Sequence, residues 1–345
     1  MKILVAMSGG VDSSSAALLL AQEGHTVAGG TMRLHTACRG TDDAADAQAV
    51  CDRLGIPFHL FDLTERFRRE VIDRFAQGYA RGITPNPCVD CNRTIKFGAF
   101  LERARELGYD TIATGHYARI EYSEERARWV LRKAPDPSKD QSYVLYTMMQ
   151  DELAHTRFPL AAYSKDSIRA LAEEYKLVTA RKKDSQDICF IPDGDHGRFL
   201  TEEYGLACPE GDFVSPDGRV LGRHRGILRY TVGQRRGLGI SAPTRLFVLE
   251  KNADTNTVVV GTEEQLKCRE FLVSDLNWIS IAPPERAVRA HVRTRYHGVE
   301  TPATITPLPD GTAHIELDAP QRAVSPGQAA VFYDGDLVVG GGTIL

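Results

Sequence analysis

Residues 2–6 read Lys-Ile-Leu-Val-Ala, and residues 7–15 follow at once as Met-Ser-Gly-Gly-Val-Asp-Ser-Ser-Ser. The apolar run has the length of a buried strand, and residues 16–21, Ala-Ala-Leu-Leu-Leu-Ala, favour a helix. Gly9 and Gly10 therefore lie at a strand-to-helix turn. Glycine lets the backbone of such a turn approach a ligand, and the unpaired N–H groups of the helix start attract an anion. The stretch predicts a phosphate-binding loop.

The polar side chains of this loop narrow the prediction. Ser8, Ser13 and Ser14 offer hydroxyl donors, whereas Asp12 is unfavourable beside a phosphate unless Mg²⁺ or the helix start uses its carboxylate. The string lacks the lysine of a Walker A loop and the spacing of a dinucleotide fingerprint. It resembles the PP-loop of the ATP pyrophosphatase superfamily, which binds the pyrophosphate half of ATP while AMP passes to a substrate oxygen. A tight turn without a ligand is the alternative.

Around this loop, short apolar runs alternate with helix-forming stretches. The expected strands are residues 25–32, 58–63 and 111–117, and the expected helices are residues 42–54, 64–79 and 96–107. This alternation predicts an α/β fold with a parallel sheet wrapped by helices, and it places Gly115 and His116 near the phosphate loop. Glycine-punctuated β segments after residue 199 predict a small central domain and a C-terminal β-barrel. We expect domains at residues 1–199, 200–268 and 269–345.

The composition agrees with a multidomain globular protein. The chain has 345 residues, 42% of them hydrophobic and 26% charged. It has no apolar run of membrane-spanning length and no signal peptide, so we expect a cytoplasmic protein without a membrane partner.

The net charge of −4 argues against a protein coated by nucleic acid, but the arginines are unevenly distributed. Residues 219–240 contain six arginines and no acidic residue, and residues 286–297 contain four arginines and two histidines. We expect both stretches to contact RNA phosphates. A solvated surface is the alternative for each.

The seven cysteines do not indicate a disulfide framework, because their number is odd and we expect a cytoplasmic chain. Residues 82–92, Gly-Ile-Thr-Pro-Asn-Pro-Cys-Val-Asp-Cys-Asn, contain two closely spaced prolines, which predict a stiff loop that presents Cys88 and Cys91. A half zinc site and an incidental pair are alternatives, since a lone Cys-x-x-Cys is ambiguous. Cys189 is the one candidate partner; the other cysteines are expected to be structural.

Several motifs together resemble one family. They are residues 8–13, 84–92, 113–119, 139–143, 184–191, 230–240 and 325–343. In this order they resemble the bacterial tRNA-specific 2-thiouridylases, whose N-terminal domain is similar to adenine nucleotide alpha hydrolases. The resemblance implies ATP-dependent 2-thiolation of the wobble uridine in tRNAs for Lys, Glu and Gln. The C2 oxygen of the base is adenylated, and a cysteine persulfide then supplies the sulfur.

The resemblance also implies roles for particular residues. Cys189 would carry the persulfide and Cys91 would attack or resolve it. ATP, with Mg²⁺, would be held by Ala6, Met7, Ser8, Gly9, Gly10, Val11, Asp12, Ser13, Met32 and Gly115. The tRNA would meet Asn86, Pro87, Cys88, Lys139, Asp140, Gln141, Arg295 and Tyr296. A cysteine desulfurase or a sulfur relay protein would be the donor.

The chain departs from the family pattern at Cys88, where many members carry Asp. Cys88, Cys91 and Cys189 together offer three thiolates, which are enough to hold a [4Fe–4S] cluster with one iron left open for sulfide. In the competing interpretation Cys88 is a bystander, and the persulfide on Cys189 reacts with Cys91. After Met32 the loop is shorter than in the family, and Arg33-Leu34-His35 replaces the usual Lys-Asn-Trp.

Two other functions are weighed against this one. A different PP-loop enzyme would adenylate a small acid or a nucleotide, and a redox-sensing RNA-binding protein would need no ATP. Pyrophosphate release distinguishes the three functions. It would depend on tRNA for the thiouridylase and on a small substrate for the other PP-loop enzyme, and it would be absent for the redox sensor.

Overall fold

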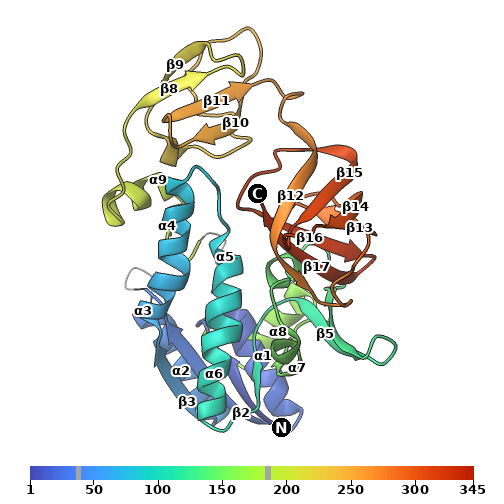
Figure 1. The fold of residues 1–345 in the computed structure, drawn as a ribbon. Coiled ribbons are helices and arrows are strands. Elements are labelled where there is room, and N and C mark those ends of the chain that lie inside the picture. The colour runs from blue at the N-terminus through green and yellow to red at the C-terminus, as the bar shows by residue number, and fades with distance from the viewer. Residues whose placement is uncertain (36–39, 183–187) are drawn as a thin grey trace.

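The computed structural model describes residues 1–35, 40–182 and 188–345, and the chain forms three parts (Figure 1). An α/β domain lies at the bottom of the view, a small sheet at the top and a barrel at the right. This arrangement confirms the fold class expected from the sequence.

The α/β domain is built on a parallel sheet with the strand order β3-β2-β1-β4-β7. Its strands are β1 (Lys2–Ala6), β2 (Thr26–Arg33), β3 (Phe58–Asp62), β4 (Thr111–Ala113) and β7 (Thr156–Arg157). β4 is shorter than the expected strand over residues 111–117, and Gly115 and His116 follow its end.

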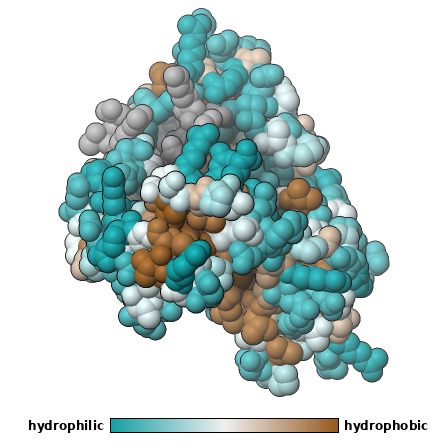
Figure 2. Space-filling model, turned by 90° about the horizontal axis from the view of Figure 1, so that it is seen from above, coloured by the Kyte–Doolittle hydropathy of each residue, from teal (hydrophilic) through white to brown (hydrophobic). Residues whose placement is uncertain are grey.

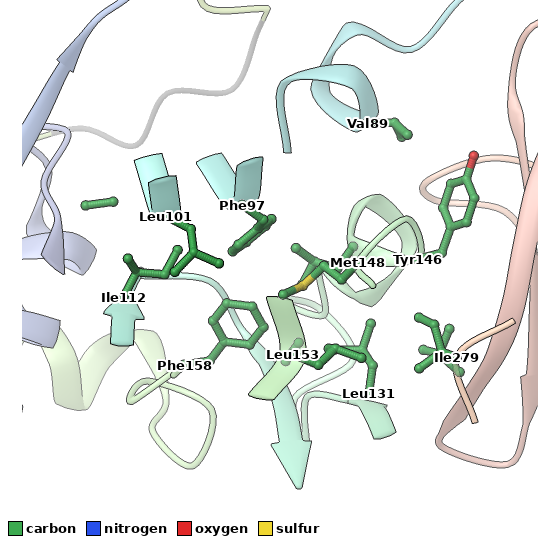
Figure 3. Packing of buried hydrophobic residues seen from close by; sticks show 14 of the residues in the cluster. Val89, Phe97, Leu101, Ile112, Leu131, Tyr146, Met148, Leu153, Phe158 and Ile279 are labelled. Atoms are coloured by element: carbon green, nitrogen blue, oxygen red, sulfur yellow. The ribbon is translucent and has the colours of Figure 1, made fainter. Parts of the chain in front are cut away.

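Side chains of β1 alternate between the two faces of the sheet. Ile3 and Val5 pack with helices α1 (Val11–Gln22), α2 (Gly40–Leu54) and α8 (Lys165–Glu174). Leu4 packs on the opposite face together with Phe97 and Leu101, two of the side chains drawn in Figure 3. Both faces of the sheet are therefore buried, as a parallel sheet requires.

Two helical columns connect β3 to β4. The first consists of α3 (Thr64–Phe67), η1 (Arg68–Ile72) and α4 (Asp73–Ala80), and the second of α5 (Pro87–Asp90), η2 (Cys91–Ala99) and α6 (Phe100–Glu106). η1 and η2 are π-helical. The first column confirms the helix expected over residues 64–79.

The second column corrects the expectation of a stiff loop through Cys91. Helix begins at Pro87, well before residue 96, so both cysteines are helical. Proline is tolerated at the first helical position because its missing N–H has no partner there. The side-chain oxygen of Asn86 caps the new helix by accepting the N–H of Cys88 at 3.1 Å.

The central sheet has the order β10-β11-β8-β9. Its strands are β8 (Gly211–Val214), β9 (Val220–His224), β10 (Phe247–Asn252) and β11 (Thr257–Gly261), preceded or interrupted by α9 (His196–Arg198), η4 (Phe199–Glu203) and η5 (Ile227–Arg229). Phe213 and Val248 from this sheet share a core with Phe75 and Cys91 of the helical columns. The central sheet is thereby packed onto the ends of those columns.

The C-terminal strands form a barrel, closed where β12 pairs with β17. They are β12 (Lys267–Trp278), β13 (Val288–Arg293), β14 (Thr301–Pro307), β15 (Ala313–Arg322), β16 (Ala329–Asp334) and β17 (Leu337–Ile344). Turns at Asp310-Gly311 and Asp334-Gly335 connect β14 to β15 and β16 to β17.

A hairpin of the α/β domain extends the barrel sheet, which the sequence did not indicate. β5 (Ala118–Ser123) pairs with β6 (Arg128–Lys133), and β6 pairs with β17 where Leu337 lies opposite Arg132. Behind it, η3 (Ser142–Leu145) and α7 (Gln150–Ala154) complete the interface. Leu131, Met148 and Ile279 pack there in one core shared by both domains (Figure 3). No helix in the described ranges is long and apolar enough to cross a bilayer.

Candidate active site and RNA-binding surface

The predicted phosphate loop connects β1 to α1. Gly10 is the N-cap of α1 and has no side chain to accept the first helical N–H groups, and Gly9 has a φ of +66°. The Ser13 and Ser14 hydroxyls both donate to the Gly10 carbonyl, at 3.1 and 2.9 Å, and the Ser8 N–H donates to the Ser13 hydroxyl at 3.2 Å. The helix start therefore keeps N–H groups available for an anion, which fits the phosphates of ATP.

Two backbone segments approach this loop closely. A Cβ on Gly9 would lie 2.5 Å from the carbonyl oxygen of Asp43, and a Cβ on Gly115 would lie 2.9 Å from the backbone carbonyl carbon of Asp12 and the nitrogen of Ser13. Only glycine fits at either position. The structure thus brings Gly115 against the loop, as expected. Met32 lies near the end of the neighbouring strand β2.

Asp12 is held by two residues from later parts of the chain. The Lys165 ammonium donates to both carboxylate oxygens at 2.7 Å, and the Tyr117 hydroxyl donates at 2.9 Å. The cation offsets the charge of the one acidic side chain within the loop, so the carboxylate does not repel a phosphate there. Whether Asp12 also serves Mg²⁺ stays a prediction.

The three candidate cysteines differ in exposure. Cys91 is buried, whereas Cys88 and Cys189 are exposed. Burial raises the pKa of Cys91 to about 12, and Cys189 and Cys88 add to the rise. Cys88 is exposed as a residue, but the surrounding protein desolvates its thiol. This desolvation raises the pKa of Cys88. Cys88 and Cys189 are therefore near enough to Cys91 to affect its pKa.

Neighbouring thiols do not make a cluster site by themselves. Among residues 1–35, 40–182 and 188–345, no three His, Cys, Asp or Glu side chains are arranged to hold a metal ion. An iron–sulfur cluster held by Cys88, Cys91 and Cys189 therefore stays a prediction.

The charge of Lys96 acts on both the cysteines and His116, which follows the end of β4. Lys96 is one π-helical turn after Cys91, and helical side chains lean back toward the preceding turn. Its charge lowers the pKa of Cys88, Cys91 and His116, opposing the larger effect of burial at the two cysteines and adding to it at the histidine. The His116 ring contacts Phe97 at 5.8 Å and its Nδ1 lies 2.7 Å from the Thr114 hydroxyl. Lys96 therefore connects the cysteines with the strand end beside the phosphate loop.

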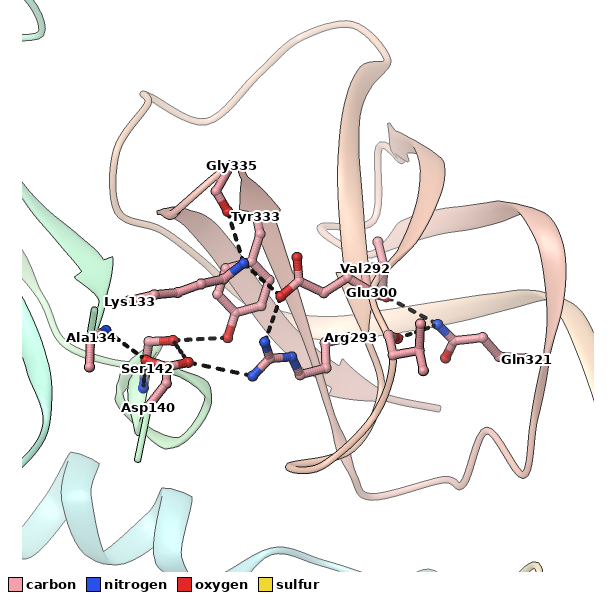
Figure 4. Close-up of polar contacts among 11 residues, drawn as sticks. Lys133, Ala134, Asp140, Ser142, Val292, Arg293, Glu300, Gln321, Tyr333 and Gly335 are labelled. Atoms are coloured by element: carbon pink, nitrogen blue, oxygen red, sulfur yellow. Dashed lines mark hydrogen bonds and ion pairs between the residues drawn. The ribbon is translucent and has the colours of Figure 1, made fainter. Parts of the chain in front are cut away.

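Asp140, one of the residues expected to meet tRNA, belongs to a buried polar network (Figure 4). The Asp140 side chain is 3% exposed, accepts the Ser142 hydroxyl at 2.8 Å and lies 3.5 Å from Arg293 of the barrel. Arg293 in turn lies 2.5 Å from Glu300, which is 2.6 Å from Lys133 of the hairpin. Asp140 is thus placed to join two domains and has almost no surface to offer an RNA.

The other expected RNA contacts lie around this network. Gln141 accepts the N–H of Tyr117 at 2.9 Å, and Asn86 is engaged as a helix cap. The Tyr296 ring contacts Tyr143 at 6.0 Å, and burial, Asp140 and Cys88 raise its pKa. Arg295 donates to the carbonyl of Arg322. Pro87 is buried, and Lys139 is half-buried. Tyr296 is the barrel residue that reaches the cysteine site.

The two basic stretches differ in how their charges are neutralised. Arg289 and Arg293 form ion pairs with Asp318 and Glu300, at 2.6 and 2.5 Å. All six arginines of residues 219–236 are exposed, and within the described chain only Arg223 among them has an ion-pair partner, Asp212. The face seen from above, on the side of the central sheet, is mostly hydrophilic, with apolar areas near its middle (Figure 2). The unpaired arginines of the central domain are the better candidates for phosphate contacts.

Sequence reasoning missed Lys96, Lys165 and Lys182. Lys182 lies 2.6 Å from Asp43 and 2.7 Å from Asp46, and so fixes the start of α2 over Gly9. None of the three lysines lies in a motif, and the partners of Lys165 and Lys182 are far away in the sequence. Two parts of the sequence considered above lie outside the described residues. They are Cys38, and residues 184–187 of the motif that contains Cys189.

The α/β domain carries this loop and the cysteine helix, and it is joined to two β domains. Together these features define a three-domain enzyme of the PP-loop class. The family models that match carry the descriptions tRNA methyl transferase HUP domain (residues 1–193), tRNA methyl transferase PRC-barrel domain (197–262) and Aminomethyltransferase beta-barrel domain (268–344). The chain belongs to the family of tRNA-specific 2-thiouridylases, as its full-length relatives show.

The relative from Chloroflexus aurantiacus is 48% identical over 351 residues, covering 99% of this chain and 98% of its own length. The one from Clostridium acetobutylicum is 46% identical over 353 residues, covering 99% of each. Both are named tRNA-specific 2-thiouridylase MnmA. A solved structure, the U34-tRNA thiolase NcsA from Methanococcus maripaludis with its [4Fe–4S] cluster, is 18% identical with a TM-score of 0.37, over 59% of this chain and 67% of the other. A likeness this distant carries no argument about the site.

Proposed function

We propose that this enzyme is a tRNA-uridine 2-sulfurtransferase that thiolates the wobble uridine of the tRNAs for Lys, Glu and Gln. The observation that supports it best is the contact of Gly115 with the phosphate loop, because Gly115 lies between Thr114 and His116, the pair that Lys96 links to the cysteines. A nucleotide loop and a sulfur site thus meet at one end of the sheet.

The first step activates the base. The helix start after Gly10 holds the pyrophosphate half of ATP, and the C2 oxygen of the uracil attacks the α-phosphorus. Pyrophosphate leaves, and the base is adenylated. A carbonyl oxygen is a poor leaving group, and the adenylate turns it into a good one.

The second step transfers sulfur. The terminal sulfur of a persulfide on Cys189 attacks C2, and AMP leaves with the former carbonyl oxygen. The Cys91 thiol then attacks the Cys189 sulfur and loses its proton to the departing base sulfur, which breaks the sulfur–sulfur bond to the base and leaves 2-thiouridine and a Cys91–Cys189 disulfide. A thiol reductant and a donor protein of the cysteine desulfurase or relay class restore the persulfide. The exposure of Cys189 suits loading by another protein, and the burial of Cys91 protects it from premature oxidation.

The test uses the purified chain with ATP, unmodified tRNA, a cysteine desulfurase with cysteine as the persulfide donor, and a thiol reductant. Pyrophosphate release is expected only when tRNA is added, followed by 2-thiouridine detected by mass spectrometry of nucleosides. Cys189→Ser is expected to keep pyrophosphate release and lose thiolation. Release without tRNA but with a small acid would overturn the proposal in favour of another PP-loop activity.

Cys88 decides between the two sulfur routes. In the persulfide route Cys88 takes no part in the chemistry, so we expect anaerobically purified protein to be colourless and Cys88→Asp to thiolate tRNA at the wild-type rate. A brown protein with about four irons per chain, losing colour and activity in Cys88→Ala, would instead establish the cluster route.

A further inference from the structure

The short segment of residues 82–86, which leads into the cysteine helix, is contacted by all three parts of the chain. From the central sheet, the Lys251 ammonium donates to the carbonyl of Ile83 at 3.3 Å and lies 4.7 Å from the centre of the Tyr79 ring. The backbone also comes close, since a Cβ on Gly82 would lie 2.7 Å from the carbonyl oxygen of Lys251. β10 is therefore packed directly on this segment.

Lys251 is an unusual residue for a packed interface. It is 6% exposed, and within the described residues no carboxylate forms an ion pair with it. Burying an ammonium group is unfavourable unless its hydrogen-bonding needs are met. Here the Ile83 carbonyl and the face of the Tyr79 ring meet part of them. The charge is thus directed at the segment and at the helix end that precedes it.

The barrel contacts the next residue from the other side. The Thr84 N–H donates to the carbonyl of Pro326 at 2.9 Å, and the Gln328 side-chain amide donates to the Thr84 carbonyl at 2.7 Å. Gly327, with a φ of +87°, makes the approach possible, because a Cβ there would lie 3.1 Å from the Thr84 carbonyl carbon. Both backbone polar groups of Thr84 are paired with the barrel.

Within its own domain the segment is bonded at its start, where the Gly82 and Ile83 N–H groups donate to the carbonyls of Tyr79 and Gly78 at 3.0 and 3.1 Å. Pro85 and Pro87 have no N–H, and Asn86 uses its side chain as the helix cap. The contacts from the two β domains therefore act on the residues that lead directly into the helix of Cys88 and Cys91.

We propose that Lys251 and Gln328 are positioning residues, which let the two β domains together set the place of the cysteine helix. The proposal rests on the proposed function in one respect: both β domains are expected to hold tRNA. Residues 83–84 then connect the RNA-binding β domains to the cysteine helix. The cysteines take their reactive position only when the central sheet and the barrel are both docked on this segment.

The experiment uses the full chain with Lys251→Met, Gln328→Met and both together. Hydrogen exchange of the amides in residues 84–91 is expected to speed up about tenfold in each single variant, the change typical of losing one hydrogen bond, and further in the double variant. Exchange in residues 7–14 is expected to stay as in wild type. The kcat for thiolation falls about tenfold while the KM for ATP is unchanged, and Lys251→Arg, which keeps the cation over the ring, restores both readouts.

The matched control is Lys267→Met, which removes only an exposed pair with Glu264. Unchanged exchange in residues 84–91 in both variants would overturn the proposal, as would a uniform increase over the whole chain, which would mean a merely structural role. If the wild-type chain does not thiolate tRNA at all, the proposed function fails, but the exchange data still decide whether the two residues hold the segment.

Discussion

The Lys165 ammonium lies 2.7 Å from both carboxylate oxygens of Asp12, so the first residue of α8 reaches into the first turn of α1. The pair lies beside the helix start that is expected to hold pyrophosphate. Its balance of charge decides how well that helix start attracts an anion.

Changing this pair should affect ATP use more than folding. In Lys165→Met the Asp12 carboxylate is left unbalanced near the phosphates, and we expect ATP affinity to fall about tenfold to a hundredfold, the range for removing a charge-assisted hydrogen bond. Asp12→Ala and Ser13→Ala should abolish pyrophosphate release. Tyr117→Phe, which removes the hydroxyl bond to Asp12 and keeps the lysine, is the milder control. Normal 2-thiouridine per tRNA in Asp12→Ala or Ser13→Ala would count decisively against the assignment of the loop.

The basic stretches should differ in their salt dependence. Replacing Arg235 and Arg236, which are exposed and unpaired in the described chain, should weaken tRNA binding. The slope of log affinity against log salt should become shallower by about 0.7 to 0.9 for each phosphate that the protein no longer neutralises. Arg289→Ala is the matched control, because its charge is already paired with Asp318 and the slope should stay the same. Equal slopes for both variants would mean a solvated surface at residues 219–236.

Two arginines of β13 should differ in their effect on stability. Arg293→Met leaves Asp140, which is 3% exposed, without its cation, while Glu300 keeps only Lys133, so the free energy of unfolding should fall by about 3 kcal/mol. Arg289→Met, on the exposed side of the same strand, should change it little. Urea unfolding monitored by fluorescence compares them. A small effect of Arg293→Met would show that the domains are held by the apolar core alone.

Lys251 predicts a pH effect. Burial lowers its pKa from 10.5 to about 8, so between these values the unfolded chain binds a proton that the folded chain has released. Stability from this group therefore rises with pH in that window, by about 1.4 kcal/mol per pH unit. Compared with Lys251→Met, the wild type should gain stability between pH 8 and pH 10 in urea unfolding. A constant difference would show that the ammonium is not buried in solution.

Local patterns predicted the parts of the site that are local. The strand, the glycines and the helix start of residues 2–21 follow one another directly, and the structure has them as expected. The predicted start of the cysteine helix was wrong because two prolines suggested a break, whereas Pro87 sits at the one helical position that accepts proline, with Asn86 as its cap.

Long-range partners had no signal in the sequence. Lys165 pairs with Asp12, Gln328 with Thr84 and Arg293 with Asp140, each across more than a hundred residues, and such pairings depend on how the three parts dock. The two basic stretches look alike in the sequence but differ in the structure. Most arginines of the central domain have no ion-pair partner in the described chain, whereas both arginines of β13 have one.

The pairing of β6 with β17 has a consequence for the order in which the protein is made. Arg132 leaves the ribosome long before its strand partner Leu337 is translated. Until then the β5–β6 hairpin presents an open strand edge, the kind of surface that pairs with other chains. The nascent α/β domain therefore keeps this edge uncovered until β17 has been made, and truncated chains lacking β17 should aggregate through this hairpin.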